Sequence, residues 1–292
     1  MAIILDGNKL AKKIKEKIKG EIEQTNVKPG LAVVIVGSDP ASKIYVKKKE
    51  TDCKQCGIHS EEFALKEDIG QEKLLSIITE LNERDDIHGI LVQLPLPKGY
   101  VSRDIIQAIC QSKDVDAFSY NNIGRIMVGD NHFIPCTPYG IIELLDHYKI
   151  PLKGKHCVIV NHSNIVGKPM AMLLLQREAT VSICHMHTTN LAKITKEADI
   201  LITAAGVPDL IKADMVKQDA VVIDVAINRL NGKICGDVDF DNVANIASHI
   251  TPVPGGVGPM TRAMLMVNTL MAASKKTSGE FLYQPLGGNI WN

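Results

Sequence analysis

Four short aliphatic runs in the second half of the chain constrain its fold most strongly. They are CVIVNHS, TVSICHM, ADILITAAG and AVVIDVA, and polar stretches of helical composition such as NLAKITKEADI separate them. Strands and helices that alternate in this way predict a parallel sheet with helices on both faces. Aromatic residues are only 4% of the chain, which suits aliphatic parallel strands better than a β-sandwich. We therefore expect an α/β fold whose second half is a doubly wound nucleotide-binding domain.

The first half repeats the same rhythm. LAVVIVG (Leu31 to Gly37) predicts a buried strand, followed by a helix with Ser38 or Asp39 as its cap and Pro40 in its first turn. HGILVQLPLP (His88 to Pro97) predicts a second buried strand that its prolines stop. Before both strands, apolar residues recur at every fourth position, which predicts an amphipathic helix; they are Leu10, Ile14, Ile18 and Ile22.

Length and loop composition predict two domains. At 292 residues the chain exceeds the usual size of one hydrophobic core, and a polar region after KDVDAF (Lys113 to Phe118) suggests a boundary near residue 120. A last strong helix is expected from about Met260 to Ala273, after the loop TPVPGGVGP. We assign no function to the poorly periodic tail beyond Lys275.

Charge and cysteine usage exclude several partners. The 33 basic and 33 acidic residues balance, so no global field attracts nucleic acid or a membrane surface. No apolar run reaches membrane-spanning length. Seven scattered cysteines indicate reduced thiols, and hence a cytoplasmic protein.

Tyr45 and Lys49 are the first candidate site residues. Four residues apart on a helix, they lie on the same face and can share one pocket. A phenol ring offers a surface for a heteroaromatic ligand, and a partly buried ammonium of lowered pKa can transfer protons near neutral pH. Such a pair is more often a half-exposed packing contact.

Two polar residues at expected strand ends support a site. Gln93 is placed at the carboxyl end of a strand and Asp116 lies inside KDVDAF. Ligands of open α/β sheets collect at such ends. An amide can orient a lysine, and a carboxylate can accept paired donors from an amino-pyrimidinone edge. Alternatively, Gln93 satisfies a strand end, and Asp114 and Asp116 cap a turn.

Four segments carry a resemblance to a known family. PASKIYVKKKE, GILVQLPLP, KDVDAF and TPVPGGVGPMT occur in this order, and over residues 3 to 274 the chain resembles methylenetetrahydrofolate dehydrogenase/cyclohydrolase. The resemblance implies that Tyr45 packs on the pterin, Lys49 is catalytic, Gln93 holds the lysine and Asp116 anchors the pterin ring. It also places in the folate site the strand-end neighbours Val92 and Leu94 and the loop residues Pro254, Gly255, Gly256, Val257 and Gly258.

The resemblance implies an enzyme with two reactions. NADP-linked oxidation of 5,10-methylenetetrahydrofolate gives the 5,10-methenyl form, and hydrolysis of that cation gives 10-formyltetrahydrofolate, which serves purine, histidine and methionine biosynthesis. It further implies a homodimer, a folate-binding catalytic domain of residues 1–120 plus 262–292, a Rossmann-like domain of residues 121–261, and a cleft between the two. The substrates would be tetrahydrofolate one-carbon derivatives, with NADP as cofactor, NAD as an alternative, and no metal.

The expected cofactor turn departs from the family pattern. VIVNHSNIVGKP (Val158 to Pro169) lies between a strand and a helix, where helix amides can bind a phosphate. Asn161 replaces the first Gly of the pattern, and we expect the turn to survive because Asn tolerates positive φ. The predicted cofactor residues are Asn161, His162, Ser163, Ile165, Val166, Gly167, His185, Met186 and Ile227.

Specificity for NADP is not settled by this pattern. His162 stands where NADP-using members often have Arg, which weakens the expected phosphate clamp. Yet ICHMHTTN ends its strand without the Asp or Glu that would hold a ribose diol, so His185, His187, Thr188 and Thr189 can accommodate a phosphate. Surface exposure without function is the alternative for each histidine.

Two further family glycines are replaced, by Ala117 and by Ala226. With Asn161, they are expected to add bulk on ligand-lining turns. A cyclohydrolase with weak or lost dehydrogenase activity is therefore an alternative, as are a non-catalytic folate-binding relative and a dehydrogenase of another substrate.

Three other signals are interpreted as structural. Cys53 and Cys56 form a lone C-x-x-C on a predicted helix, without the second pair that a zinc site needs. Cys184, His185 and His187 alternate along a strand and no carboxylate accompanies them. The acids of GKICGDVDF (Gly232 to Phe240) suggest a turn.

Overall fold

A computed structural model describes residues 1–25, 27–230 and 232–278, so the tail beyond residue 278 lies outside the described residues. The described chain forms two compact units. Unit 1 comprises Met1–Ala11 and Thr137–Thr261, and unit 2 comprises Lys12–Cys136 and the described residues from Arg262 onward. Both units are α/β, in agreement with the predicted fold class.

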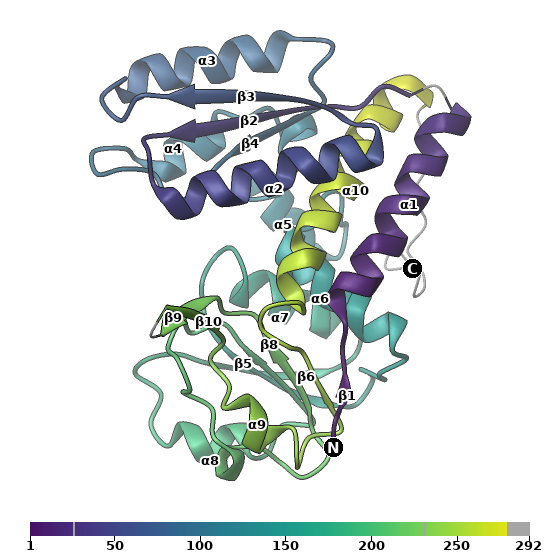
Figure 1. Cartoon of the computed structure of the whole chain (residues 1–292), viewed down its shortest axis with the longest axis vertical. Helices are drawn as coiled ribbons and strands as arrows, with labels where there is room; N and C mark the ends of the chain where they lie inside the picture. Colours follow the sequence, from purple (N-terminus) through teal and green to yellow (C-terminus); the bar gives the residue numbers. More distant parts are fainter. Residues whose placement is uncertain (26, 231, 279–292) are drawn as a thin grey trace. The chain divides into compact units, whose positions relative to one another are not determined.

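Unit 1 is built on a six-stranded parallel sheet (Figure 1). The four predicted strands form: β5 (His156–Val160), β6 (Thr180–Cys184), β7 (Ile200–Thr203) and β8 (Val221–Asp224). Two short strands, β11 (His249–Ile250) and β1 (Ile3–Ile4), extend the sheet in the order β1-β11-β8-β7-β5-β6. The order reverses beside β5, because β6 lies on one side of it and β7 on the other. In open α/β sheets, ligands bind at the carboxyl ends of strands at such a reversal.

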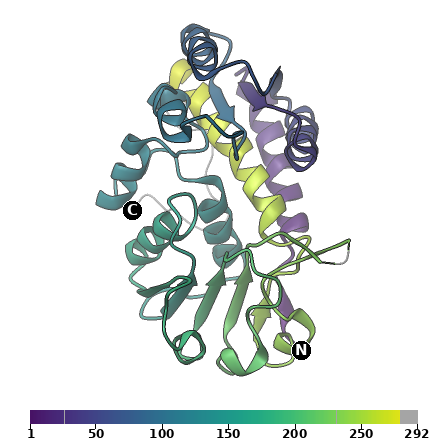
Figure 2. The ribbon, with the colours of Figure 1, turned by 90° about the vertical axis from the view of Figure 1, so that its left-hand side faces the viewer.

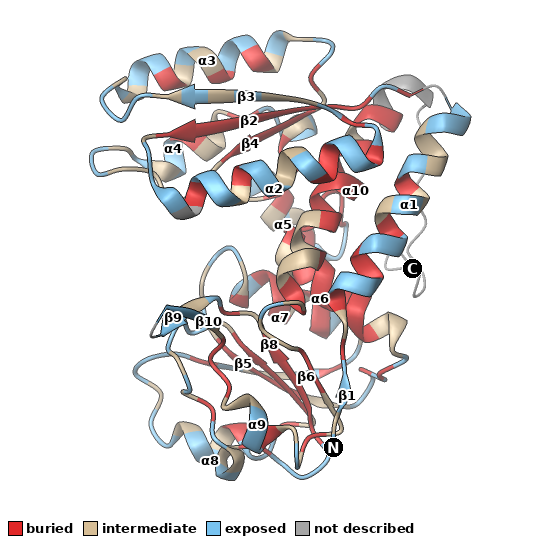
Figure 3. Cartoon of the chain, viewed as in Figure 1, coloured by how far each residue is buried: buried red, intermediate tan, exposed pale blue. Residues whose placement is uncertain are grey.

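Helices connect these strands, as the rhythm of the sequence predicts. They are α7 (Gly167–Gln176), α8 (Leu191–Thr195) and α9 (Phe240–Val243), with a short 3-10 turn η2 (Ala213–Met215), and α6 (Cys136–His147) precedes β5. Aliphatic side chains of β5, β7 and β8 are almost all buried (Figure 3). Those on one face of the sheet, such as Val158, Leu201 and Val222, form a core with residues of the connecting segments. A hairpin of β9 (Asn228–Leu230) and β10 (Lys233–Cys235) stands apart from the sheet.

Unit 2 contains a three-stranded parallel sheet in the order β3-β2-β4. The central strand β2 (Gly30–Val36) is buried along its whole length between β3 (His59–Leu65) and β4 (Gly89–Val92). Its alternate residues Ala32, Val34 and Val36 pack in one core cluster with residues of α3 (Gln71–Glu83) and α4 (Ser102–Gln107). The predicted strand over His88 to Pro97 is shorter than expected: β4 ends at Val92, and Gln93 makes the last backbone hydrogen bond to β2 before the prolines.

Helix α2 (Pro40–Cys56) follows β2 as predicted. Asp39 is its cap, since the side chain accepts a hydrogen bond from the Ser42 N–H at 2.7 Å, and Pro40 occupies the first turn. Gly57 ends the helix in the left-handed conformation, with φ of 79°. Unit 2 also holds the 3-10 turn η1 (Gln111–Lys113) and α5 (Tyr120–Val128).

Three helices of unit 2 are joined by one buried carboxylate. Asp52 of α2 accepts from Lys15 Nζ of α1 (Gly7–Thr25) and from Arg262 Nε of α10 (Val257–Ser278), both at 2.6 Å. These helices lie side by side in two views (Figures 1 and 2). The predicted apolar face of α1 is confirmed, since Leu10, Ile14 and Ile18 are buried.

Helix α10 begins earlier than the sequence suggests. It starts at Val257 rather than near Met260, so Val257 and Gly258 form its first turn instead of the preceding loop. The acids expected to mark a turn in GKICGDVDF follow strand β10, which the sequence did not predict. Among the described residues, no helix is long and apolar enough to cross a membrane.

Candidate functional site

In unit 2, Lys49 and Gln93 are in contact. Lys49 lies on α2 one turn after Tyr45, and both side chains are partly buried. Lys49 Nζ donates to Gln93 Oε1 at 3.0 Å. Gln93 directly follows β4, where its N–H donates to Val34 O at 2.8 Å and its side-chain amide donates to Leu94 O at 2.7 Å. The amide is therefore fixed with its oxygen toward the lysine, which is the orientation that the strand-end hypothesis requires.

Register places Asp116 close to the same strand end. An isolated parallel bridge pairs Asp114 with Ile90 of β4, so the segment after Asp114 runs alongside the end of that strand. Val92 is the last residue of β4, and Leu94 follows Gln93 with a cis peptide to Pro95. The segment that carries Asp116 is thus held at the carboxyl edge of the sheet by backbone pairing.

Asp114 has a structural role within this turn. Its carboxylate accepts hydrogen bonds from the Ser119 N–H at 2.8 Å and from Asn122 Nδ2 at 2.8 Å. The capping alternative is therefore confirmed for Asp114. Asp116, two residues later, interacts instead with Lys49 through its charge.

The charge state of Lys49 is set by opposing effects. Burial is the largest and lowers its pKa below the ordinary value of a lysine, because the charged form loses its hydration. The negative charge of Asp116 acts in the opposite direction, and the positive charge of Arg262 adds to the lowering. A lysine that loses its proton more easily is suited to proton transfer.

The pKa of the Asp116 carboxyl group is shifted in the opposite direction to that of Lys49. Burial raises its pKa above the ordinary value, and the nearby Lys49 partly counters this. The Cys136 thiol lies near the same carboxylate and donates to Val115 O at 3.4 Å, and burial raises the thiol pKa well above its usual range. Lys49, Asp116 and Cys136 therefore influence one another's pKa values. Cys136 and Arg262 were not predicted, because no local motif marks their approach to Lys49.

Ala117 follows Asp116 and adopts a left-handed backbone conformation, with φ of 60°. Its side chain is fully buried. The expected bulk on a ligand-lining turn is therefore wrong at this position, because protein atoms already cover the methyl group. The cost of Ala in place of Gly is backbone strain.

The glycine loop Pro254–Gly256 belongs to unit 1. Gly255 has φ of 117°, which only glycine adopts without strain, and its carbonyl accepts from the Asn8 N–H at 3.0 Å. A β carbon on Gly256 would lie 2.7 Å from Thr251 Cβ. The glycines are thus required by close packing within the unit, and substrate contact by this loop stays a prediction.

A cavity of about 660 Å³ opens in unit 1 at the topological reversal of the sheet. It lies at the carboxyl ends of β5, β6 and β7. Its lining includes five predicted cofactor residues: Asn161, His162, Ser163, His185 and Met186. Thr188, which the sequence analysis named as able to accommodate a phosphate, also lines it. The sequence did not single out the remaining lining residues: Val160, Asn164, Lys168, Leu191, Ala205, Val207 and Leu210. The run ITAAG at the end of β7 was the signal that could have pointed to Ala205, Val207 and Leu210.

Asn161 organises the turn between β5 and α7. Its Oδ1 accepts from the Ser163 N–H at 2.8 Å, from Ser163 Oγ at 2.7 Å and from the Gly167 N–H at 3.1 Å, and its Nδ2 donates to Ala204 O at 2.7 Å. The expected positive φ is wrong, because Asn161 is not among the left-handed residues. The side chain holds the turn by hydrogen bonds instead.

This bonding occupies helix amides that a phosphate would otherwise meet. The Gly167 N–H donates to Asn161, and the Val166 N–H donates to Ser163 Oγ at 3.2 Å. Val166 and Gly167 begin α7 and, like Ile165, are not among the residues that line the cavity. A ligand phosphate in this cavity therefore depends more on side chains than a bare helix N-terminus would imply.

Ala226 and Ile227 lie away from the cavity lining. Ala226 is buried, has no left-handed backbone, and its N–H donates to Asp224 Oδ1 at 3.2 Å. The bulk expected there is also wrong, since its methyl group is enclosed by protein. Ile227 is 48% exposed and lies near the first turn of α10, where a β carbon on Gly258 would be 3.6 Å from its Cδ1.

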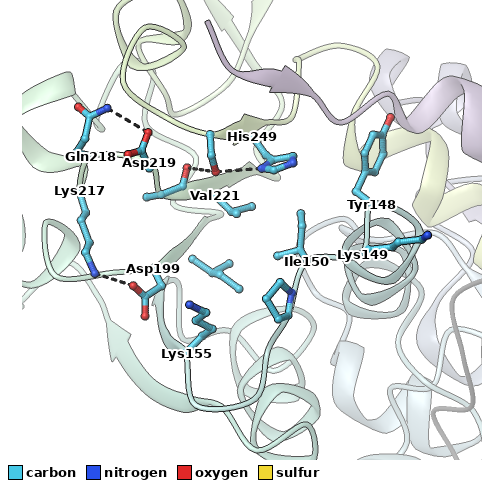
Figure 4. Close-up of a pocket in the computed structure, with 14 residues that line it drawn as sticks. Tyr148, Lys149, Ile150, Lys155, Asp199, Lys217, Gln218, Asp219, Val221 and His249 are labelled. Atoms are coloured by element: carbon cyan, nitrogen blue, oxygen red, sulfur yellow. Dashed lines mark hydrogen bonds and ion pairs between the residues drawn. The ribbon is translucent and has the colours of Figure 1, made fainter.

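A smaller cavity of about 230 Å³ lies where β7, β8 and β11 begin (Figure 4). No predicted site residue lines it. Two of its charged side chains pair with each other, since Lys217 Nζ contacts Asp199 Oδ1 at 2.6 Å, and Gln218 Nε2 donates to Asp219 Oδ1 at 3.2 Å. This end of the sheet is opposite to the end where ligands bind in such folds.

In the described part of the chain, no group of three or more His, Cys, Asp or Glu side chains is placed to hold a metal ion. Cys53 and Cys56 are both buried on α2, and burial raises the pKa of each thiol to about 12. A thiol of such pKa is a poor ligand and a poor nucleophile.

Comparison with known proteins covers both units. The tetrahydrofolate dehydrogenase/cyclohydrolase catalytic domain matches residues 5–116, and the NAD(P)-binding domain of the same family matches residues 135–277. The chain is 53% identical over 276 residues to the bifunctional protein FolD of Acetivibrio thermocellus, covering 93% of this chain and 97% of that one. It is 54% identical over 281 residues to that of Aquifex aeolicus, covering 94% and 97%.

Solved structures agree. The bifunctional methylenetetrahydrofolate dehydrogenase/cyclohydrolase of Campylobacter jejuni superposes with a TM-score of 0.93 at 49% identity, covering 94% of this chain and all of that one. The Trypanosoma brucei dehydrogenase-cyclohydrolase, solved with NADP and an inhibitor, gives 0.91 at 33% identity, covering 95% and 99%. From these matches across both units, the chain belongs to the tetrahydrofolate dehydrogenase/cyclohydrolase family.

Proposed function

We propose that this chain catalyses two consecutive folate reactions, with Lys49 as the group that transfers protons. It oxidises 5,10-methylenetetrahydrofolate to the 5,10-methenyl form with NADP, and hydrolyses that cation to 10-formyltetrahydrofolate. The observation that carries this proposal is the contact of Lys49 with Gln93 at 3.0 Å, at the carboxyl end of β4. Membership of the family and the fixed orientation of the Gln93 amide support the same assignment.

Hydrolysis makes the greater demand on side chains. Water attacks the cationic carbon, and protons must leave the water and reach the departing ring nitrogen. Lys49, whose pKa burial lowers, exchanges these protons. Gln93 accepts from the lysine without a charge of its own, so it orients Lys49 without fixing it in the protonated form.

Folate recognition is assigned to Tyr45 and Asp116. The Tyr45 ring lies one helical turn before Lys49 and offers a flat surface to the pterin. The Asp116 carboxylate is suited to paired donors on the amino-pyrimidinone edge. The assignment of Val92, Leu94 and Pro254–Gly258 to the same substrate rests on the family pattern.

Dehydrogenation depends mainly on positioning, since NADP, when bound, accepts the hydride. The cavity of about 660 Å³ has the size and place of a nucleotide site, and no carboxylate lines it. A carboxylate there would repel a ribose phosphate, so the lining fits NADP. Asn161, His162, Ser163, His185 and Met186 would hold the cofactor, and the family pattern adds Ile165, Val166, Gly167 and Ile227.

A cyclohydrolase with weak dehydrogenase activity is the second candidate. The observation that favours it is Asn161, which places a side chain in the cofactor cavity where the family pattern has glycine. Ala117 and Ala226 lend it little support, since their methyl groups are enclosed by protein.

One assay separates these candidates. Purified protein is given the methylene substrate with NADP or NAD, and the methenyl substrate alone, and both reactions are followed by absorbance. The bifunctional proposal predicts NADP-dependent oxidation at a rate comparable with hydrolysis. Hydrolysis without oxidation would support the second candidate, and binding of folate without either reaction would identify a non-catalytic relative.

We also propose that the chain forms a homodimer and acts in the cytoplasm. Strand β6 forms one edge of the six-stranded sheet, and Ile183 on it is 42% exposed, so this edge supports a self-association surface. Sedimentation of the purified protein at several concentrations tests this assignment, and a monomer throughout would exclude the dimer.

A further inference from the structure

A buried acid of the GKICGDVDF segment contacts one wall of the cofactor cavity. Residues 205–210 follow β7 and contribute Ala205, Val207 and Leu210 to the cavity lining; we call this segment the β7 wall. Asp237 is fully buried and is not itself a lining residue. Any effect of Asp237 on a ligand in the cavity therefore passes through the β7 wall.

Three consecutive amides of the β7 wall point to the Asp237 carboxylate. Its Oδ2 accepts from the Ala205 N–H at 2.6 Å and from the Gly206 N–H at 3.3 Å. Its Oδ1 accepts from the Val207 N–H at 2.8 Å. Consecutive N–H groups arranged in this way form a concavity, or nest, that binds an anion. Here the anion is a side chain of the protein, so the amides are satisfied before any ligand binds.

Two polar side chains add to the contacts of the same carboxylate. Thr203 Oγ1, at the end of β7, donates to Oδ2 at 2.9 Å, and Asn228 Nδ2, at the start of β9, donates to Oδ1 at 3.0 Å. Hydrogen bonds to a charged acceptor are roughly twice as strong as those between neutral groups. Asp237 thus ties the β7 wall to the end of its own strand and to the segment after β8.

The main chain of Asp237 holds the far end of the β7 wall. Its carbonyl accepts from the Ile211 N–H at 2.9 Å, and an isolated parallel bridge pairs Ile211 with Val238. Ile211 directly follows Leu210, which lines the cavity. One residue therefore fixes the β7 wall near both of its ends.

Asp237 is in turn held by a second buried carboxylate. Asp224, the last residue of β8, accepts from the Asp237 N–H at 3.1 Å with Oδ1 and from the Val238 N–H at 2.9 Å with Oδ2. Gly236 permits this approach, because a β carbon there would collide with the Asp224 carboxylate. The position of Asp237 is therefore set by the end of a sheet strand.

We propose that Asp237 is a positioning residue for the nicotinamide cofactor, because its carboxylate fills the amide nest after β7 and so holds the β7 wall in the shape that binds the nucleotide. This inference rests on the NADP-linked activity proposed above. The residues that the wall contributes to the lining are apolar, so the wall acts on NADP and NAD alike. Hydrolysis, which is assigned to Lys49 in unit 2, does not depend on it.

Replacement of Asp237 by Asn removes the charge at nearly constant volume. The new NH2 group must face either the Ala205 and Gly206 N–H groups or the Val207 N–H, so at least one amide of the β7 wall loses its acceptor. The nucleotide-binding shape then leaves a buried donor unsatisfied. We therefore expect the Kd values of NADP and NAD both to rise about tenfold in calorimetric titration of the whole, folded protein. Hydrolysis of the methenyl substrate should stay within about twofold of the wild-type rate.

Hydrogen exchange separates positioning from a general loss of stability. The amides of Ala205 and Val207 should exchange slowly in the free wild type and faster in Asp237→Asn, whereas those of β5 should stay protected in both. Asp239→Asn is the matched control, because Asp239 lies on the same segment but its carboxylate contacts Lys212 and Asn242 instead. This variant should match the wild type in exchange and in the affinity for both nucleotides.

The outcomes distinguish this inference from the dehydrogenase proposal. Unchanged nucleotide affinity in folded Asp237→Asn, or a loss for NADP alone, would overturn the positioning role, while oxidation by the wild type would leave the dehydrogenase proposal intact. Faster exchange in β5 as well, with unchanged affinity, would reduce Asp237 to a structural residue. The free wild type gives a test even if the variant does not fold: amides of Ala205 and Val207 that become protected only when NADP binds would overturn the inference. A wild type that binds neither nucleotide would overturn both proposals.

Discussion

The two units hold their functional charges in opposite ways. In unit 2, Lys49 is partly buried, and burial, Asp116 and Arg262 all act on its pKa. In unit 1, His162 and His185 are exposed at the ends of their strands. A buried charge takes its state from the protein, whereas an exposed one takes it from solvent and ligand. The chain thus combines a lysine whose pKa the fold lowers with exposed histidines that line the cavity of unit 1.

Removal of the Lys49 ammonium should have the largest effect on activity. Lys49→Met should lower hydrolysis of the methenyl substrate by about 10²- to 10⁴-fold, the usual loss for a general acid–base residue. NADP affinity, which depends on unit 1, should be unchanged. Steady-state hydrolysis and cofactor titration measure the two effects. Lys48→Met is the matched control, because Lys48 is exposed on the same helix; hydrolysis within about twofold of the wild-type rate in Lys49→Met would contradict the role.

The charge of Asp116 offers a sharper test of the same cluster. Asp116→Asn removes the negative charge that raises the pKa of Lys49, so that pKa should fall further below its ordinary value. The limb of the hydrolysis pH profile that reports Lys49 should therefore move to lower pH. Folate KM should rise about 10- to 100-fold, since a hydrogen bond to a charged group contributes about 1.5–3 kcal/mol. A limb that stays in place or moves to higher pH would refute the coupling.

In unit 1, the turn should depend on the Asn161 side chain. Asn161→Gly restores the family residue but removes three hydrogen bonds accepted by Oδ1 and one donated by Nδ2. Unfolding in urea should show a loss of about 1–3 kcal/mol, the usual cost of leaving buried polar partners unsatisfied. Asn164→Gly, which removes only an exposed contact with Lys168, is the comparison. Equal stability of the two variants would show that the network contributes nothing.

The smallest effects concern the two alanines at family glycine positions, which should respond in opposite directions. Ala117→Gly relieves a left-handed conformation and should raise the free energy of unfolding by about 0.5–1 kcal/mol. Ala226→Gly relieves no strain and should lower it by a similar amount, about 0.5–1 kcal/mol. Denaturant unfolding of both variants measures the difference. A shift of the same sign in both would indicate that the conformation of Ala117 carries no strain.

Sequence reasoning identified what local patterns and strand ends encode. Helical spacing brings Tyr45 and Lys49 to one face, and the end of an apolar run marks Gln93. The place of Asp116 inside KDVDAF marked it as well, and the family resemblance implied its role. Contacts between distant segments were not predictable, such as that of Asp52 with Arg262, which are 210 residues apart.

Backbone conformation was the other feature that could not be predicted from the sequence. Nothing in the sequence indicates that Asn161 holds its turn by side-chain hydrogen bonds, or that the methyl group of Ala117 is enclosed. The expected bulk at the alanines was wrong for this reason, because a residue type does not reveal which way its β carbon points. The lining of the cofactor cavity by Lys168 likewise depends on how α7 is oriented.

The most direct test is a measurement of the ionisation of Lys49 itself. Lysine side chains labelled with ¹³C are titrated by NMR in the wild type, and the Lys49→Met spectrum assigns the resonance. The account predicts a midpoint clearly below about 10.4, the ordinary value for lysine, and a further decrease in Asp116→Asn. A midpoint at or above the ordinary value would contradict a lysine that burial prepares for proton transfer.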